Sequence, residues 1–237
     1  MSSDVGADVR DQVVDACRIL AVGGHEHLFL GHVSARASGQ DRFWVKSTGL
    51  GLGEVGHEDL VLVDLDGRRR EGEGPLHGEL PIHTEIHRRR AEVTCVVHTH
   101  PFHVAAFSAS NAEFAMVSQE STWFTEGIAR FESALRIETI ELGQRLAETL
   151  GDRSAAILRN HGLVVAASSV ERAVVLAIAL EQSLRVQVAA ALFGDVVAIP
   201  ESEAARIRAS LDPPDGSRVR ATYRYLRRRA GRSEPTG

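Results

Sequence analysis

The sequence predicts a single domain of the α/β class, on two observations. The first is length, because 237 residues are enough for one full-sized hydrophobic core and no long linker divides them. The second is pattern, since short runs rich in β-branched residues, which predict strands, alternate with longer runs whose hydrophobic residues recur at helical spacing. The composition, 43% hydrophobic and 25% charged, is ordinary for a globular protein and excludes the disordered and membrane-embedded classes.

The individual elements follow from hydrophobic spacing and from the residues that start and stop each run. Gly23 and Gly24 end the first helix, and Pro81 begins the second. In chain order, the expected helices cover residues 8–22, 81–91, 101–109, 134–150 (starting at Ser133 or Ala134), 170–193 and 201–211. The expected strands cover residues 33–37, 42–47, 60–65, 93–97, 114–117 and 128–131, and residues 157–165 form a hairpin.

Two local signals mark the start of the long helix and the end of the last one. Residues 168–171 fit a capping box at the start of the long helix. Pro213 and Pro214 break the last predicted helix. We therefore expect one domain over residues 1–212, followed by a tail over residues 213–237 that is partly flexible or lies at a subunit interface.

Two histidines stand at the end of the buried strand 93–97. In a strand, residues i and i+2 point to the same face, so His98 and His100 project side by side. Two neutral imidazoles at this spacing can hold one divalent metal ion. Histidines are also common in protein cores, so a metal site requires further ligands.

Two candidate ligands lie elsewhere in the chain. His161 is at the bend of the predicted hairpin, where a side chain can leave the core and face a cleft. Glu79 comes just before the helix that Pro81 begins, where a backbone turn can aim its carboxylate at a metal. Three imidazoles and one carboxylate are the ligand set of a catalytic zinc or manganese site, if the fold brings them together.

Five separated motifs resemble, in this order, those of the class II aldolase/adducin family. They are residues 31–36 (Gly-His-Val-Ser-Ala-Arg), Thr48-Gly49, Glu79 with Pro81 and residues 83–86, residues 98–101 (His-Thr-His-Pro), and residues 160–162 (Asn-His-Gly). The resemblance covers roughly residues 10–195. It implies a three-layer α/β/α fold with a central, mainly antiparallel sheet, and a cyclic homotetramer with active sites at subunit interfaces. It also implies that His98, His100 and His161 bind the metal, with Glu79 as a ligand that can leave and act as acid or base.

The chain departs from the phosphate-using aldolases of this family at the residues that bind the substrate phosphate. Those members bind the substrate phosphate with an Asn in the first motif, a Ser-Gly or Thr-Gly pair, and two serines just before the Glu. Here His32 replaces the Asn and His77-Gly78 replaces the serines, whereas Thr48-Gly49 remains. Because hydroxyl donors are lost and imidazoles are gained, these loops suit a substrate carboxylate better than a phosphate dianion.

These replacements resemble the decarboxylase members of the family, which act on hydroxylated aromatic or pyridine carboxylates. The resemblance then implies that substrate is bound by the first-motif residues His32 and Ser34, by Thr48 and Gly49, and by His77 and Gly78. It also makes His32, with Glu79, a candidate catalytic residue, because a nearby imidazole could protonate the carbanion after carbon dioxide leaves.

The expected chemistry is that of a metal-dependent carbon–carbon lyase. A divalent ion held by three histidines leaves positions open for a hydroxyl and a carbonyl on adjacent carbons, and its charge stabilises the enolate that forms. Decarboxylation and retro-aldol cleavage can both proceed through that enolate. Decarboxylation of a hydroxy-substituted aromatic or heteroaromatic acid is preferred. Aldol cleavage of a sugar or sugar phosphate, and sugar-phosphate epimerisation or dehydration, are the alternatives.

The remaining expectations concern partners and location. An adducin-like interaction module would have lost ligands, whereas all four are present here. Zinc and manganese fit the ligand set, as do iron and cobalt. A net charge of -5 argues against nucleic acid as a partner, so we expect a small-molecule substrate. We also expect a cytoplasmic protein, because residues 1–5 lack the features of a signal peptide and no run approaches the length of a membrane span.

Several motifs have a second interpretation. His83 and His87 lie one helical turn apart and could bind a metal themselves, but packing is the preferred role for His83. His32 could equally cap a turn. Tyr223 and Tyr225 are expected to be exposed or to lie on a neighbouring subunit. Three arginine triplets, at residues 68–70, 88–90 and 227–229, are expected to be solvated or paired with carboxylates.

Overall fold

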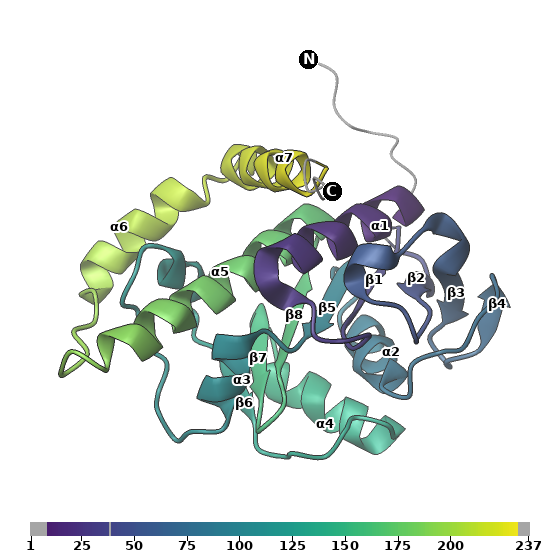
Figure 1. The fold of residues 1–237 in the computed structure, drawn as a ribbon, viewed down its shortest axis with the longest axis horizontal. Coiled ribbons are helices and arrows are strands. Elements are labelled where there is room, and N and C mark those ends of the chain that lie inside the picture. Colours follow the sequence, from purple (N-terminus) through teal and green to yellow (C-terminus); the bar gives the residue numbers. More distant parts are fainter. Residues whose placement is uncertain (1–8, 38, 232–237) are drawn as a thin grey trace, which may run out of the picture.

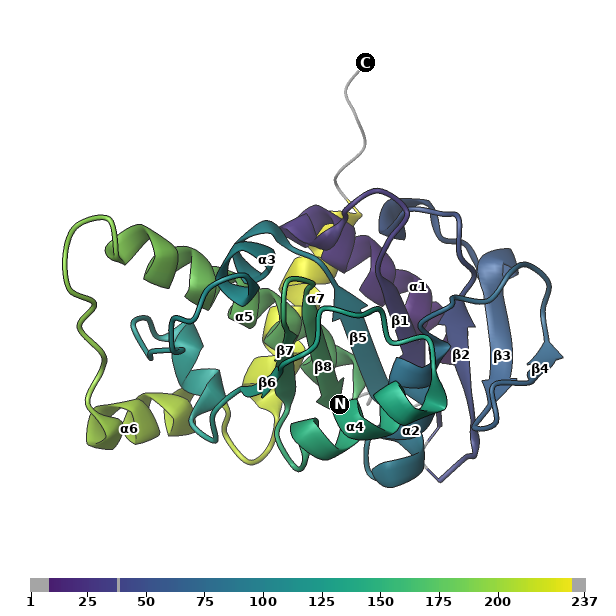
Figure 2. The ribbon, with the colours of Figure 1, turned by 90° about the horizontal axis from the view of Figure 1, so that it is seen from below.

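One mixed sheet forms the centre of the molecule. The structure is a computed structural model that describes residues 9–37 and 39–231; residues 1–8, where we expect no signal peptide, lie outside the described part. Eight strands follow the order β4-β3-β2-β1-β5-β8-β7-β6, which Figure 2 shows from one edge to the other. The strands are β1 His32–Ala35, β2 Arg42–Lys46, β3 Leu60–Asp64, β4 Arg69–Glu71, β5 Cys95–Thr99, β6 Ala129–Phe131, β7 Ala155–Leu158 and β8 Leu163–Ala167.

Neighbouring strands are antiparallel throughout, except that β6 runs parallel to β7. The register of β1 on β5 places His32 opposite His98. β8 pairs on the other side of β5, so that Leu163 lies opposite Thr99. The turn that joins β7 to β8 therefore reaches the same end of the sheet as the histidines of β5.

Helices cover both faces of this sheet (Figure 1, Figure 2). One face carries α1 Val9–Leu20, α5 Val170–Ala190 and α7 Ser217–Ala230, and the other carries α2 Leu80–Arg89 and α4 Ile140–Leu150. The other α-helices of the described residues are α3 Phe102–Ser108, which packs against α5, and α6 Glu201–Leu211. This arrangement confirms the three-layer α/β/α fold with a mainly antiparallel sheet.

The alternation of side chains along β5 separates the two hydrophobic cores. Cys95 and Val97 are buried in the core with α1 and α5, whereas Val96 is buried in the core with α2 and α4. Because side chains two residues apart share a face, His98 points to the α2 side of the sheet. The catalytic candidates of β5 therefore lie next to the start of α2, where Glu79 is found.

The long helix α5 is confirmed, but it ends at Ala190 rather than at residue 193 and its N-cap differs from the predicted one. Ser169 is its N-cap and accepts a hydrogen bond from the backbone N–H of Arg172, one residue later than the predicted capping box. By length and composition α5 could span a membrane, but most of its apolar stretch is buried inside the fold, as in the core helix of a globular domain.

One predicted helix starts too early, and one predicted strand is wrong. Residues 133–139 are not helical, because Thr139 caps α4 at Ile140 by accepting from the backbone N–H of Leu142. Residues 114–117 do not pair as a strand; the N–H of Ala115 instead donates to the side chain of Gln187. The short strand β4 was not predicted because its three residues are polar and exposed and have no hydrophobic alternation. A 3-10 helix over Glu120–Phe124 was not predicted because it is held by packing on α5 and α6, which are distant in sequence.

The C-terminal segment, expected to be a tail that is partly flexible or lies at a subunit interface, is helical over most of its described length. Residues Ser217–Ala230 form helix α7, which packs on α1 and α5. Tyr223 is only 8% exposed and belongs to the core of its own chain, whereas Tyr225 is exposed. Hydrophobic residues at positions 219, 223 and 226 recur at helical spacing, which is why this helix has one face to bury.

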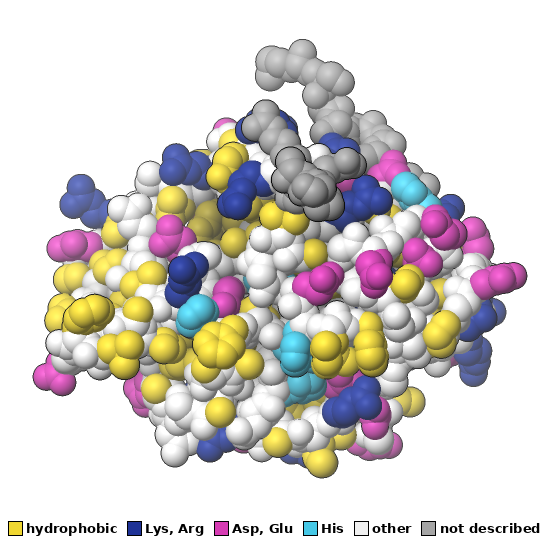
Figure 3. Space-filling view, viewed as in Figure 1, with side chains coloured by type: hydrophobic (Ala, Val, Ile, Leu, Met, Phe, Trp, Pro, Cys, Tyr) yellow, Lys and Arg dark blue, Asp and Glu magenta, His cyan; other side chains and the backbone are white. Residues whose placement is uncertain are grey.

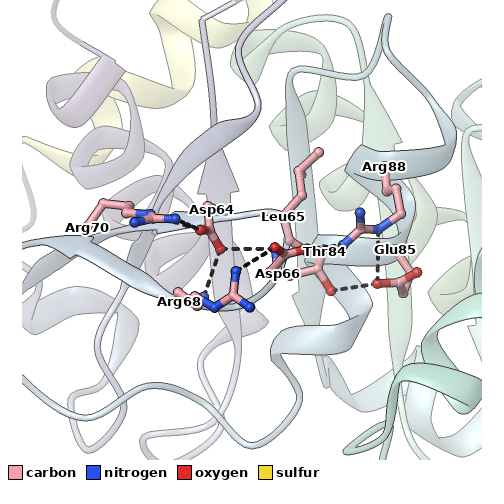
Figure 4. A network of polar contacts seen from close by, with 8 residues as sticks. All are labelled: Asp64, Leu65, Asp66, Arg68, Arg70, Thr84, Glu85 and Arg88. Carbon is pink, nitrogen blue, oxygen red and sulfur yellow. Dashed lines mark hydrogen bonds and ion pairs between the residues drawn. The ribbon is translucent and has the colours of Figure 1, made fainter.

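Four arginines of the first two triplets, Arg68, Arg70, Arg88 and Arg90, pair with carboxylates. Arg70 binds Asp64 in the β3–β4 hairpin, and Arg68 binds Asp66 at 2.7 Å (Figure 4). Arg88, in the last turn of α2, contacts the same Asp66 and also Glu85 (Figure 4). These contacts join the hairpin to α2 on the solvent side and lie away from the histidines.

Candidate metal centre and active site

Four side chains from separate elements converge at one end of the sheet. Glu79 comes from the turn before α2, His98 and His100 from the end of β5, and His161 from the β7–β8 turn. One ligand atom from each lies within 4.8 Å of the others. The structure therefore brings together the ligand set predicted from the sequence, and it could hold one divalent ion.

The position of Glu79 follows from the way α2 begins. Glu79 is the residue before the helix, and Pro81 occupies the first turn, where its missing N–H costs nothing. Its Oε1 accepts a hydrogen bond of 2.9 Å from the backbone N–H of Ile137. Its Oε2 is then left 3.7 Å from Nε2 of both His98 and His161.

A backbone hydrogen bond determines which nitrogen of His98 faces the cluster. Nδ1 lies 2.9 Å from the carbonyl oxygen of Leu163, which can only accept, so Nδ1 carries the proton. Nε2 therefore carries the lone pair and points at Nε2 of His100, 2.9 Å away. A carbonyl that orients a histidine in this way is the usual support for a metal ligand. The residues present thus fit a divalent cation.

The β7–β8 turn reaches the cluster because Gly162 has no side chain. A Cβ at this position would lie 2.4 Å from the carbonyl oxygen of Thr99 and 2.5 Å from Cδ2 of His100. Asn160 adopts a left-handed backbone conformation, with φ of 51°, that non-glycine residues seldom take and that Asn tolerates best. Together these residues hold His161 against His100, with ring centroids 4.7 Å apart.

The surroundings of the cluster set the charge of its members. Burial, followed by the proximity of the other imidazoles, lowers the pKa of His100 to about 2 and that of His161 to about 4. Burial by itself would raise the pKa of Glu79, but the contacts with His98 and His161 and the Ile137 N–H hold it below its ordinary value. At neutral pH these are two neutral imidazoles and a carboxylate, the forms that bind a metal ion.

A cavity of about 530 Å³ opens beside the cluster. Histidine side chains reach the surface near the middle of the face shown in Figure 3, with hydrophobic side chains next to them. The cavity is lined by ligand residues, by apolar residues and by a few charged ones: Gly24, Glu26, His27, Leu30, Glu79, His100, Phe102, Ala105, Ala134, Arg136, Asn160 and His161. Its size and its mixed lining suit a small organic molecule.

Behind the cluster, four side chains form a buried chain of hydrogen bonds. His87 Nδ1 lies 3.3 Å from the carbonyl of Val93 and so carries a proton, which leaves its Nε2 to accept from Ser34 Oγ at 3.0 Å. Ser34 Oγ then accepts from Nδ1 of His83 at 2.6 Å, and Nε2 of His83 accepts from Nδ1 of His32 at 2.6 Å. The chain therefore determines the tautomer of His32, whose ring centroid lies 4.9 Å from that of His98.

None of the six predicted substrate-binding residues is among the described residues that line the cavity, and two of them, His32 and Ser34, belong to this chain of hydrogen bonds. His32 is 2% exposed, Ser34 is fully buried, and neither is among the described residues that line the cavity. His77 packs on His32 with ring centroids 4.3 Å apart, and burial lowers its pKa to about 3. The N–H of Thr48 donates to the carbonyl of Pro75, and Gly49 has a positive φ of 94° in the same loop.

The sequence interpretation missed the segment between β6 and α4. Arg136 lines the cavity and Ile137 binds Glu79, yet both fell inside the predicted helix 134–150. Thr139, a residue type preferred at N-caps, was the signal that could have divided that run.

Comparison with known proteins agrees with this geometry. Residues 11–188 match the model of the Class II Aldolase and Adducin N-terminal domain. A 3,4-dihydroxyphthalate decarboxylase from Arthrobacter keyseri is 33% identical over 217 residues, which cover 85% of this chain and 86% of that protein. An L-fuculose phosphate aldolase from Methanococcus maripaludis is 30% identical over 152 residues, which cover 64% of this chain and 81% of that protein.

A solved structure shows the same fold. The L-fuculose 1-phosphate aldolase from Glaciozyma antarctica PI12 is 27% identical and superimposes with a TM-score of 0.84, over 97% of this chain and 95% of that chain. The matched region contains every motif on which the resemblance rested. The chain is therefore a lyase that belongs to the class II aldolase and adducin family.

Proposed function

We propose that this protein is a divalent-metal-dependent carbon–carbon lyase whose preferred reaction is decarboxylation of a hydroxy-substituted aromatic or heteroaromatic carboxylate. The observation that carries the proposal is the convergence of Glu79, His98, His100 and His161, of which all but the buried His98 line a cavity large enough for such an acid. Zinc and manganese are the proposed ions, with iron and cobalt as further candidates, because imidazole with carboxylate suits all of them.

The chain's own residues have distinct roles in the proposed reaction. His98, His100 and His161 would hold the ion, which when bound would polarise a substrate oxygen and stabilise negative charge developing there. Glu79 is ionised, and its Oε1 is held by the N–H of Ile137, so it is oriented to accept or return a proton at Oε2. His32 remains a proposed proton donor. Its ring proton is on Nδ1 and faces His83, so donation requires a second proton on Nε2 and a substrate that reaches past His98.

Decarboxylation is placed ahead of aldol cleavage for two reasons. The decarboxylase from Arthrobacter keyseri matches more of this chain, and at higher identity, than the aldolase from Methanococcus maripaludis does. The cavity is also lined on one side by Leu30, Phe102 and Ala105, and these apolar groups favour a planar ring over a sugar phosphate.

Aldol cleavage of a sugar or sugar phosphate is the second candidate. The observation that favours it is the close structural match to the L-fuculose 1-phosphate aldolase from Glaciozyma antarctica PI12. The Thr48-Gly49 loop also keeps the pattern of a phosphate site, and Lys46 supports it by donating from Nζ to the carbonyl of Leu50 at 2.7 Å.

Product analysis separates the two reactions. Metal-loaded protein is supplied with hydroxylated aryl carboxylates and, separately, with ketose phosphates, while carbon dioxide and aldehydes are measured. We expect carbon dioxide without any aldehyde from the first set. A small aldehyde released from a ketose phosphate, with the aryl acids left intact, would reverse the order of the two candidates.

Metal content tests the site itself. His98→Ala removes the histidine that the Leu163 carbonyl orients, so we expect the purified protein to lose its divalent ion and its activity, measured by elemental analysis and turnover. His103→Ala is the matched control, because His103 lies on α3 and binds Glu181 rather than the cluster. Equal metal content in the wild type and His98→Ala would contradict the assignment.

We further propose a cytoplasmic homotetramer with its active sites at subunit interfaces. Exposed apolar side chains next to the cavity, among them Leu28, Phe29 and Phe102, support contact with a second subunit there. Light scattering coupled to size-exclusion chromatography measures the mass directly, and a monomeric mass would contradict this part of the proposal.

A further inference from the structure

The cavity beside the cluster contains one fixed positive charge. Arg136 is the only arginine or lysine among the described residues that line it, whereas two carboxylates, Glu26 and Glu79, lie along the same wall. An acidic substrate entering this cavity is therefore repelled by both carboxylates unless a cationic side chain, together with the ion that the cluster would hold, offsets them. Arg136 is the residue placed to do so.

Two contacts of the guanidinium and one of the neighbouring backbone hold Arg136 in relation to the cluster. Its Nη1 pairs with Oε1 of Glu138 at 2.8 Å, and its Nε lies 3.9 Å from Oε2 of Glu79. The next residue, Ile137, donates its N–H to the other oxygen of Glu79 at 2.9 Å. The Arg136 side chain is nevertheless 62% exposed, so it is positioned from one side and open to a ligand from the other.

Gly78 provides the space that this ion pair occupies. A Cβ on Gly78 would lie 2.9 Å from Oε1 of Glu138 and 3.6 Å from Nη2 of Arg136. Gly78 is also one of the two positions where the resemblance places a phosphate-binding serine in the aldolases. The loss of that hydroxyl and the approach of a guanidinium therefore occur at the same point of the site.

We propose that Arg136 binds a carboxylate of the substrate and selects aromatic acids over neutral analogues. The inference rests on the proposed lyase function, since it concerns the same cavity. A guanidinium is planar and presents paired N–H donors, which match the two oxygens of a carboxylate. The resulting charged hydrogen bonds are stronger than hydrogen bonds between neutral groups. Because the Arg136 guanidinium lies close to Glu79, a substrate carboxylate bound to it would lie next to the metal ligands. One aromatic ring would then reach from Arg136 to the ion.

The test compares an acid with its neutral analogue in the absence of turnover. Binding of 2-hydroxybenzoate and of 2-hydroxybenzamide is measured by calorimetry with zinc-loaded wild-type protein and with Arg136→Gln. We expect the variant to bind the acid at least tenfold more weakly and to bind the amide unchanged. Arg136→Lys should recover part of the loss, because it keeps the charge but not the paired donors.

A matched control is Arg145→Gln, which removes an exposed arginine of α4 that stacks on Phe131 outside the cavity. It should leave the binding of both compounds unchanged. Steady-state kinetics provide a second readout, in which Arg136→Gln should raise KM for an aryl acid more than it lowers kcat.

Failure of this inference is distinguishable from failure of the lyase proposal. An Arg136→Gln protein that still prefers the acid, or a wild-type protein that binds acid and amide equally, overturns the role of Arg136 while metal retention and turnover stay as proposed. Wild-type protein that prefers the acid through Arg136 but turns over none of the acids supports the inference and contradicts decarboxylation.

Discussion

At the scale of single residues, the site depends on atoms that a sequence motif does not display. The Asn-His-Gly motif indicates a turn, but only the structure shows that Gly162 touches the end of β5, where a Cβ would overlap the backbone of Thr99 and the ring of His100. In the same way, the carbonyl of Leu163 decides which nitrogen of His98 faces the cluster. Both features align ligands that the sequence had already identified.

The close approach at Gly162 leads to a prediction. Gly162→Ala must push the β7–β8 turn away from His100, at a cost of about 1–3 kcal/mol typical of overpacking. We therefore expect zinc affinity to fall about tenfold or more, measured by competition with a chromogenic chelator. Gly231→Ala is the control, because a Cβ there meets its nearest atom at an ordinary 3.7 Å. Equal zinc affinity in Gly162→Ala and the wild type would show that the turn is free to move.

At the scale of elements, the hydrogen-bonded chain from His32 to Val93 ties β1 to α2. Alternation along β1 predicts that His32 and Ser34 share a face, and helical spacing predicts that His83 and His87 share one. Neither pattern says that the two faces meet. They do so because β1 lies beside β5 and α2 covers that side of the sheet, so four polar side chains satisfy one another inside the fold.

Removal of the central hydroxyl should therefore destabilise the protein more than a surface change does. Ser34→Ala leaves His83 Nδ1 and His87 Nε2 without their partner in a buried site, which costs about 1–3 kcal/mol. We expect that decrease in the free energy of unfolding by urea denaturation, with the metal content retained. Ser202→Ala, on the exposed side of α6, should change it by less than about 0.5 kcal/mol. Equal free energies of unfolding of the two variants would contradict the stabilising role of these hydrogen bonds.

At the scale of the whole molecule, buried histidines make stability depend on pH. Burial, as the largest cause, lowers the pKa of His25, His77 and His87 to about 3 and that of His32 and His83 well below its ordinary value. The folded protein therefore keeps these imidazoles neutral, whereas the unfolded chain takes up protons below about pH 6.5. Their contribution to stability is complete from about one pH unit above that value and is lost as the pH falls through it.

We thus expect metal-free protein to lose stability between pH 7.5 and about 5.5, above the range in which most carboxyl groups titrate. Each histidine that binds a proton only on unfolding adds a slope of up to about 1.4 kcal/mol per pH unit below its unfolded pKa. Urea denaturation of chelator-treated protein at several pH values measures the slope. His25→Phe should reduce it, because His25 is fully buried in the folded state. A free energy of unfolding that does not change with pH in this window would contradict the burial of these histidines in their neutral form.

The sequence alone determined the class of fold, most of the strands and helices, and the identity of the four candidate ligands. It could do so because hydrophobic period, capping residues and ligand types are local properties of the chain. Only the tertiary structure decided which distant segments meet: the 132–138 segment that brings Arg136 and Ile137 to Glu79, the burial of His32 behind His98, and the packing of Tyr223 in its own core. These contacts come from strand order and helix packing, in which each residue's partner is set by the whole sheet rather than by its neighbours in sequence.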